Sequence, residues 1–112
     1  KEYNNWSLFE LDGALDLHSI HDLKSLFKHL CNQDKNVLLD FDKVRSVDSS
    51  GISCLMLGQK LLSDSGKKLR IAKVSSSVKI IFQITRGYEV FEIYDELSFA
   101  AQSGELDQDK VA

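Results

Sequence analysis

Short apolar runs typical of strands alternate with apolar stripes of helical spacing along most of this chain, and this alternation constrains the fold most. Val37-Leu38-Leu39-Asp40-Phe41 is a nearly continuous apolar run of the kind that forms a buried central strand. Residues 69–74 alternate between apolar and polar side chains, and residues 90–94 carry Phe91 and Ile93 on one face. Strands that alternate with helices form mostly parallel sheets with right-handed crossovers. We therefore expect a single α/β domain with a mostly parallel or mixed sheet of four to five strands and four helices.

The first helix is predicted over residues 20–31, where apolar side chains recur three and four positions apart and form one stripe. Lys24 lies off that stripe. Asp16 or Ser19 is expected to cap the helix, and Ser19 with Asp22 resembles a capping box.

Three more helices are expected further along the chain. Residues 52–62 are apolar around much of a helix circumference, so this helix should be largely buried, and Ser65-Gly66 fits its end. Residues 78–85 form the next helix, with three serines as possible N-caps and Gly87 as the C-terminal cap. A final helix is indicated by Leu97, Ala100 and Ala101.

The N-terminal part predicts a strand with a turn at its end. Residues 3–11 alternate loosely, as in an edge strand. Asp12-Gly13 is a two-residue turn signal, because Gly tolerates positive φ, and residues 14–15 would form a very short return strand. Residues 42–46 are expected to be a loop after the central strand.

Length and charge exclude several classes of function. The chain has 112 residues, which fits one domain; we assign it residues 1–102 and expect a frayed tail over residues 103–112. Its 14 Lys+Arg against 17 Asp+Glu give a net charge of −3, which argues against a general nucleic-acid binder. Two cysteines are too few for a disulfide framework, so a reducing compartment is favoured. No apolar run approaches the ~20 residues that span a bilayer, and no signal peptide is visible.

The segment Asp48-Ser49-Ser50-Gly51 lies where the buried strand ends and the second helix begins, the position at which open α/β sheets carry their functional groups. The first turn of a helix has N–H groups without internal partners and the positive end of the helix dipole. A phosphorylated hydroxyl is well stabilised there, since it adds about −1.5 to −2 charges and three acceptor oxygens. On the motif alone, ordinary helix capping is the commoner interpretation.

This segment and the strand before it resemble the central signature of STAS domains, and more narrowly that of the bacterial anti-sigma factor antagonists. In that signature an apolar strand with an acid near its end is followed by a short spacer, Asp-Ser-Ser-Gly and an apolar helix. The resemblance extends over nearly the whole chain, through residues 11–16, Gly66-Lys67-Lys68-Leu69, residues 77–87 and Phe91-Glu92-Ile93-Tyr94. It implies the STAS fold.

The resemblance also implies a partner-switching mechanism. In the family, an anti-sigma factor of the histidine-kinase-like ATPase fold phosphorylates a serine of this motif; Ser50 matches that serine, and Ser49 is the alternative. Asp48 and Gly51 would support the loop. The unphosphorylated protein binds the anti-sigma factor and frees the sigma factor, and a serine phosphatase reverses the modification. This mechanism predicts a cytoplasmic protein without catalysis, cofactor or metal of its own, and without nucleic-acid binding or membrane insertion.

The expected partner-binding surface combines the first turn with the serine motif: Asp12, Gly13, Val47, Ser49, Ser50, Ile52 and Ser53. Ala14 stands where the family usually has Glu, and Ser46, beside Arg45, stands at a position that is typically large and apolar. These departures bear on the identity of the partner more than on the fold.

Two other classes of function stay open. A STAS module can be a cytoplasmic accessory subunit of a lipid or anion transport system, or a domain of a larger signalling or transporter protein; the chain starts at Lys1 rather than Met, which fits the latter. A small nucleotide-binding domain or enzyme is the third possibility, because a fold does not fix a function. The sequence contains neither a Walker-type loop nor G-x-G-x-x-G.

The remaining candidates have ordinary structural explanations. A surface metal site at His18, His21 and Asp22 is conceivable, but His29 lies eleven residues beyond His18, about 16 Å along a helix, so solvated histidines are favoured. No histidine is expected near the serines, which argues against a hydrolase triad. Cys31 and Cys54 are expected to be buried and unreactive. The basic residues in and before the strand expected over residues 69–74 are predicted to form a solvated edge: Lys67, Lys68, Arg70 and Lys73.

Overall fold

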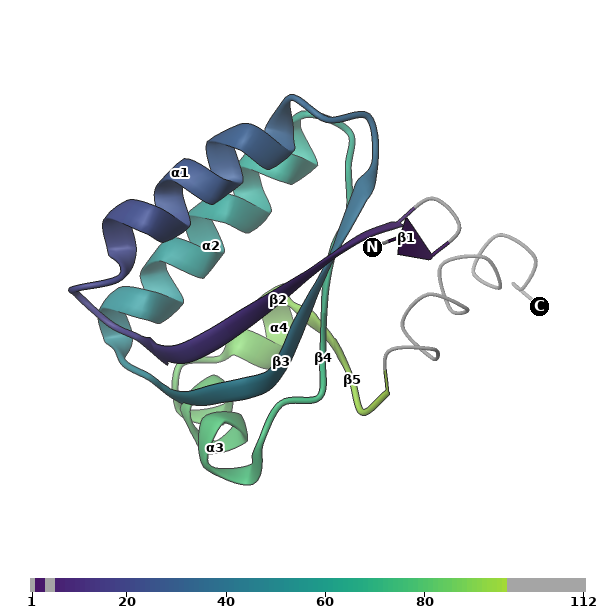
Figure 1. Cartoon of the computed structure of the whole chain (residues 1–112). Coiled ribbons are helices and arrows are strands. Elements are labelled where there is room, and N and C mark those ends of the chain that lie inside the picture. Colours follow the sequence, from purple (N-terminus) through teal and green to yellow (C-terminus); the bar gives the residue numbers. More distant parts are fainter. Residues whose placement is uncertain (1, 4–5, 97–112) are drawn as a thin grey trace.

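The computed structural model describes residues 2–3 and 6–96. These residues form one five-stranded sheet in which the strands lie in chain order (Figure 1). The strands are β1 (Glu2–Tyr3), β2 (Trp6–Leu15), β3 (Asn36–Val47), β4 (Leu69–Ala72) and β5 (Glu92–Tyr94). β1 is antiparallel to β2, and all other neighbours are parallel. The predicted α/β fold with a mixed, mostly parallel sheet is confirmed.

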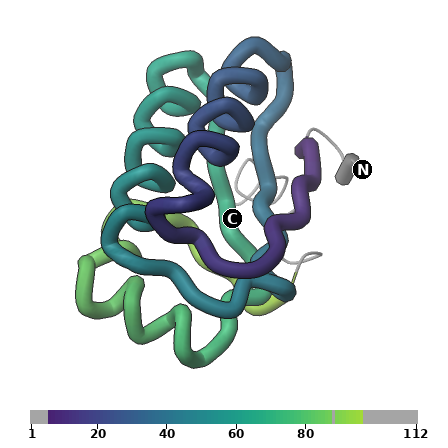
Figure 2. The backbone as a smooth tube through the Cα atoms, turned by 60° about the vertical axis from the view of Figure 1, so that its left-hand side comes forward, coloured from purple at the N-terminus to yellow at the C-terminus, as the bar shows by residue number. Residues whose placement is uncertain are grey.

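The helices of the described part are α1 (Ile20–Cys31), α2 (Ser49–Asp64), α3 (Ser76–Ile84) and the short α4 (Gly87–Val90). Each parallel strand lies beside its predecessor on the same side, so right-handed crossovers place the connecting helices on one face of the sheet. α1 and α2 run side by side over that face, as Figures 1 and 2 both show, and α3 and α4 lie below them in Figure 1.

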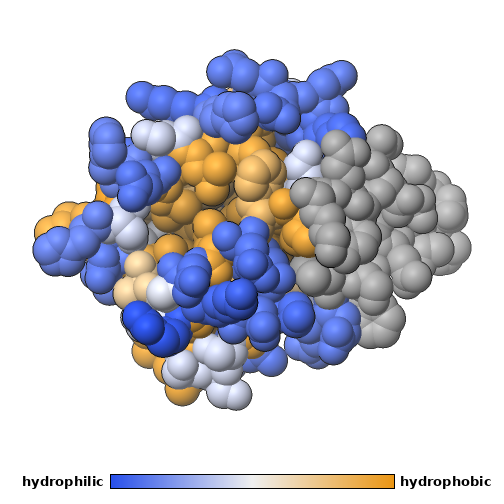
Figure 3. All heavy atoms as spheres, in the orientation of Figure 1, coloured by the Kyte–Doolittle hydropathy of each residue, from blue (hydrophilic) through white to orange (hydrophobic). Residues whose placement is uncertain are grey.

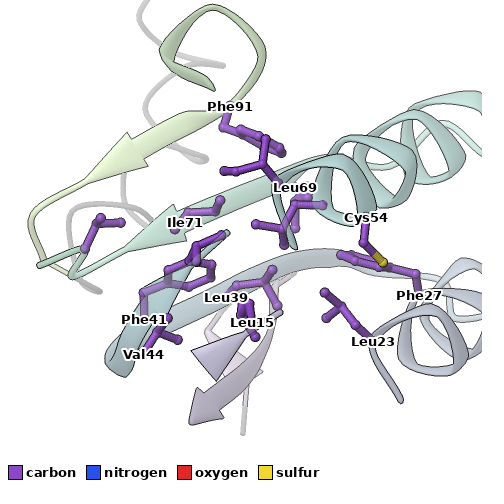
Figure 4. Packing of buried hydrophobic residues seen from close by; sticks show 14 of the residues in the cluster. Leu15, Leu23, Phe27, Leu39, Phe41, Val44, Cys54, Leu69, Ile71 and Phe91 are labelled. Carbon is purple, nitrogen blue, oxygen red and sulfur yellow. The ribbon is translucent and has the colours of Figure 1, made fainter. Parts of the chain in front are cut away.

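The main core lies between this face of the sheet and the helices. Successive strand side chains point to opposite faces, so Leu39 and Ile71 face the helices and are fully buried. Phe27 from α1 and Cys54 from α2 meet above the strands, as Figure 4 shows. This packing fixes the first turns of α1 and α2 relative to the strand ends.

The opposite face holds a second, smaller cluster around Arg70. The guanidinium carbon of Arg70 lies 4.7 Å from the ring centroid of Trp6 and 5.4 Å from that of Tyr94. Its Nε pairs with the carboxylate of Glu92, and the arginine side chain is fully buried. The prediction of a solvated basic edge is therefore wrong for Arg70, because cation–π contacts and an ion pair compensate its desolvation.

The predicted turn at Asp12-Gly13 is wrong, because β2 continues to Leu15 as a strand parallel to β3. Gly13 adopts φ +84°, and the pairing register shifts on both sides of the Asp12-Gly13 pair. Across each shift β3 contains one residue more than β2, so Gly13 lies beside bulges of β3 and not in a hairpin turn. The loop predicted over residues 42–46 is also wrong, since these residues continue β3.

The end of α3 differs from its prediction as well. α3 ends at the C-cap Thr85, Arg86 adopts φ +62°, and Gly87 begins α4 instead of capping α3. A Cβ on Gly87 would lie 2.4 Å from the Phe82 ring, so this glycine permits close packing. Val90 belongs to α4, which shortens the last predicted strand. The predicted final helix and the tail over residues 103–112 lie outside the described residues.

Of the other predicted caps, two are confirmed and one is wrong. Gly66 adopts φ +79° after α2, and the Ser75 hydroxyl accepts a hydrogen bond from the Val78 N–H at 3.3 Å. The Ser19 hydroxyl does not cap α1: it accepts from the N–H of Asp16 at 2.9 Å and donates to its carbonyl at 3.0 Å. The capping box fails because the β2–α1 loop uses this hydroxyl itself.

Candidate functional site

The Asp48-Ser49-Ser50-Gly51 segment lies at the carboxyl end of β3, where α2 begins. Asp48 is the N-cap of α2: its Oδ1 accepts a hydrogen bond from the Gly51 N–H at 2.9 Å. Its carbonyl accepts from the Ile52 N–H at 3.0 Å. The carboxylate thus satisfies one of the free donors of the first turn and adds a favourable charge at the positive end of the helix dipole.

The same segment is joined to the end of the neighbouring strand. The Asp48 N–H donates a hydrogen bond to the Leu15 carbonyl at 3.1 Å. Gly51 lies against this carbonyl so closely that a Cβ would stand 2.3 Å from the oxygen. Glycine is therefore required by packing, and the start of α2 is fixed to the β2–α1 loop.

The serines of α2 face an open hollow between α1 and α2. Ser49 and Ser53 are exposed, whereas Ser50 is half-buried. The hollow has a volume of about 350 Å³ and is lined by Ile20, Lys24, Ser49, Ser50, Ser53, Cys54 and Leu57. A partner or an anion can reach the Ser50 hydroxyl from this side.

The structure separates the other residues of the predicted surface from these serines. Val47 and Ile52 are only 4% and 3% exposed and belong to the main core, so their side chains support the loop from beneath. Asp12 lines a different hollow of about 220 Å³ between α1 and β2, with Leu11, Leu15, Ser19, Asp22, Leu23 and Leu26. In the view of Figure 3 an apolar area lies at the centre of the molecule, with hydrophilic side chains above and below it.

Two residues at the site escaped the sequence analysis. Leu17 is 69% exposed in the β2–α1 loop, which the Leu15–Asp48 hydrogen bond holds beside α2. Lys24 lines the serine hollow from α1. Leu17 could have been found as an apolar residue within a polar loop. Lys24 could have been expected to face solvent, because it lies off the apolar stripe of its helix.

The thiol of Cys54 lies in the wall of this hollow and is 4% exposed. Burial raises the pKa of Cys54, and the positive charge of Lys24 opposes this shift. Cys31 is partly buried, and both cysteines are free thiols. The predicted burial is therefore confirmed for Cys54, whereas Cys31 is only partly buried.

The histidines lie apart from the serines on or beside α1, and His18, His21 and His29 are exposed. His29 shares a 3.1 Å hydrogen bond with Gln33. Within the described ranges, no three His, Cys, Asp or Glu side chains are grouped so as to hold a metal ion. In this same part of the chain, no helix has the length and apolarity needed to cross a bilayer.

Comparison with known proteins defines the class. The profile of the STAS domain matches residues 1–100, so the chain belongs to the STAS domain family.

Three solved proteins illustrate the shared fold. A proposed anti-sigma factor antagonist from Thermotoga maritima is 22% identical with a TM-score of 0.84, covering 92% of this chain and 90% of that one. A sulfate transporter family protein from Wolinella succinogenes is 17% identical with a TM-score of 0.81, covering 95% and 89%. The anti-sigma factor antagonist SpoIIAA in its unphosphorylated form is 15% identical with a TM-score of 0.65, covering 100% and 96%. SpoIIAA of Bacillus is also known in a phosphorylated form.

Proposed function

We propose that this STAS domain is an anti-sigma factor antagonist whose binding is switched by phosphorylation of Ser50. In the unphosphorylated state it binds an anti-sigma factor, a serine kinase of the histidine-kinase-like ATPase fold, and thereby releases the sigma factor. A serine phosphatase restores the binding state. The domain itself is a cytoplasmic binding module and kinase substrate without catalysis or cofactor of its own.

The observation that carries this proposal is the placement of Ser50. Its hydroxyl lies in the first turn of α2, half-buried beside an open hollow, while the Asp48 carboxylate already caps the helix through Gly51. The hydroxyl is therefore not needed as the helix cap. Ser49 is more exposed and is the alternative acceptor.

The proposed modification transfers the γ-phosphoryl group of ATP from the kinase to Ser50. The Ser50 Oγ attacks the γ-phosphorus of ATP held by the kinase, and the bond from that phosphorus to the β–γ bridging oxygen breaks. ADP leaves, and the hydroxyl proton passes to a base of the kinase or to solvent. The product carries about −1.5 to −2 additional charges at the start of α2.

This charge acts on binding more than on folding. At a helix N-terminus an anion is favoured by the dipole, by about 0.3–1 kcal/mol, so the domain stays folded. In a closely packed interface the same dianion must lose its water and meets any acidic group of the partner. The added charge also stands near the Asp48 carboxylate, which deepens the negative potential of this edge.

The docking surface that we propose contains the accessible residues around the hollow. Ser49, Ser50 and Ser53 belong to it, and the exposed side chain of Leu17 extends it across the β2–α1 loop. Asp12 lines the separate hollow between α1 and β2, so Asp12 and its neighbour Gly13 are left out of this surface. Val47 and Ile52 are left out because the core buries their side chains.

The proposal is tested by intact-mass analysis after incubation with the cognate anti-sigma kinase and ATP. One added phosphoryl group is expected, mapped to Ser50, lost in Ser50→Ala and retained in Ser49→Ala. The phosphorylated protein should bind the kinase at least tenfold more weakly. Phosphorylation retained by Ser50→Ala, or unchanged affinity after modification, would refute the proposal.

A second candidate function is that of a STAS subunit or domain in a transport system. The structural similarity to the sulfate transporter family protein favours it. In that case the domain should co-purify with a membrane transporter, and its affinity for that transporter should be unaffected by Ser50→Asp. Binding to an anti-sigma factor that Ser50→Asp abolishes would exclude this alternative.

A further inference from the structure

The hollow beside Ser50 contains a cation that the proposed function does not use. Lys24 lines it from α1, opposite Ser49, Ser50 and Ser53 of α2. Within residues 2–3 and 6–96, the ammonium group of Lys24 takes part in no ion pair or hydrogen bond. Its charge is therefore available to an anion on the α2 side.

Lys24 and Ser50 line the same hollow from the two helices on either side of it. Cys54 is four residues after Ser50, so the two side chains lie on the same face of α2, about one turn of 5.4 Å apart. The charge of Lys24 is felt at Cys54, where it opposes the rise in pKa that burial causes. A lysine on a flexible four-carbon stem can move its charge over such a distance.

The surroundings of the hollow favour an anion. A second hollow of about 240 Å³ adjoins the first along the same two helices and shares Lys24, Cys54 and Leu57 with it. Lys28, one turn after Lys24, lines this second hollow. Among the described residues that line either hollow there are two lysines and no Asp or Glu. The nearby Asp48 carboxylate is already bound to the Gly51 N–H.

We propose that Lys24 is the intramolecular counter-ion of a phosphoryl group on Ser50. This inference rests on the proposed function, because it concerns the modified state of that serine. The ion pair holds the phosphoryl group in the groove between α1 and α2 and offsets part of its repulsion by Asp48. The domain thus tolerates the added charge.

The test measures the second pKa of the phosphoryl group by phosphorus NMR. Phosphoserine is placed at position 50 during synthesis of the protein, so the experiment needs no kinase. A neighbouring ammonium favours the dianion, so the folded protein should have a lower second pKa than the same protein unfolded in urea. Lys24→Gln should raise it by about 0.2–0.7 units, the contribution of an exposed ion pair, and 0.5 M salt should reduce this difference.

Lys28→Gln is the matched control, since it removes the same charge one turn further along α1. It should shift the pKa by less than half as much as Lys24→Gln. Trp6 fluorescence in urea checks that both variants are folded. An equal pKa in the parent and Lys24→Gln proteins, or an equal shift in both variants, would overturn the inference. Failure of every kinase to modify Ser50 would refute the proposed function and leave this titration valid.

Discussion

Gly51→Ala tests whether close packing, rather than helix capping alone, holds the segment Asp48-Ser49-Ser50-Gly51 in place. In an ordinary helix this substitution stabilises by about 0.8–1 kcal/mol, because alanine restricts the unfolded chain and favours the helix. Here the new Cβ would stand 2.3 Å from the Leu15 carbonyl oxygen and 3.0 Å from its carbon. An ordinary contact between a carbon and a carbonyl oxygen is about 3.3 Å, so one backbone must withdraw by about 1 Å.

The expected magnitude follows from three opposing contributions. Relieving an overlap of this kind costs about 1–3 kcal/mol. The 3.1 Å hydrogen bond from the Asp48 N–H to the Leu15 carbonyl is weakened by the same displacement, which costs about 1 kcal/mol more. The higher helix propensity of alanine stabilises the folded state by about 1 kcal/mol and offsets part of this cost. The net destabilisation is therefore about 1–3 kcal/mol.

Urea unfolding followed by tryptophan fluorescence measures this difference. Trp6 is the single tryptophan and is 2% exposed, so it reports the loss of the fold. With a slope of about 2 kcal/mol per molar urea, the midpoint should fall by roughly 0.5–1.5 M. Ser63→Ala, at an exposed position of the same helix, should leave the midpoint unchanged or raise it slightly. A Gly51→Ala midpoint equal to or above the parent value would refute the packing argument.

Three further predictions concern single groups. Asp48→Ala should lower the free energy of unfolding by about 0.5–2 kcal/mol in urea, and Asp48→Asn by less, because asparagine keeps an acceptor for the Gly51 N–H. Arg70→Ala should cost about 2–4 kcal/mol and change the Trp6 emission, because a buried guanidinium beside two aromatic rings is lost; an unchanged spectrum would contradict the stacking. In a Cys31→Ser background, stability should fall as the pH rises above about 9, because the raised pKa of Cys54 means that the folded state holds its proton longer than the unfolded state; a Cys54→Ala control should lose this dependence in urea titrations.

The alternation of strands and helices predicted the parallel sheet, because burial on both faces leaves near-continuous apolar runs such as Val37-Leu38-Leu39. Local signals failed where tertiary pairing overrode them. By residue type, Asp12-Gly13 is as compatible with an irregular position inside a strand as with a hairpin turn. Only the pairing of β2 with β3 shows that the strand continues. Ser19 is a good cap by residue type, but the loop that begins at Asp16 uses its hydroxyl first.

Only those features of the candidate site that depend on residues close together in the sequence could be predicted. The Asp48 cap is local, since its acceptor and the Gly51 donor are three residues apart. The contact of Gly51 with Leu15 and the approach of Lys24 to the serines depend on how two loops and two helices meet. The burial of Val47 and Ile52 depends equally on the packed structure, which is why a surface drawn from sequence included them.

The position of the serines between apolar side chains matters for any switch at this site. A charge at the rim of an interface changes affinity little, because water still screens it, whereas a charge that must be desolvated costs several kcal/mol. Leu57 is 43% exposed in the wall of the hollow that Ser50 lines, and Leu17 is 69% exposed in the β2–α1 loop. A partner that covers Leu57 would also exclude water from Ser50, because both residues line the same hollow, as rim contacts do around a hot spot. In the complex that we propose, apolar contacts around the hollow would therefore make a phosphoryl group at Ser50 costly to enclose.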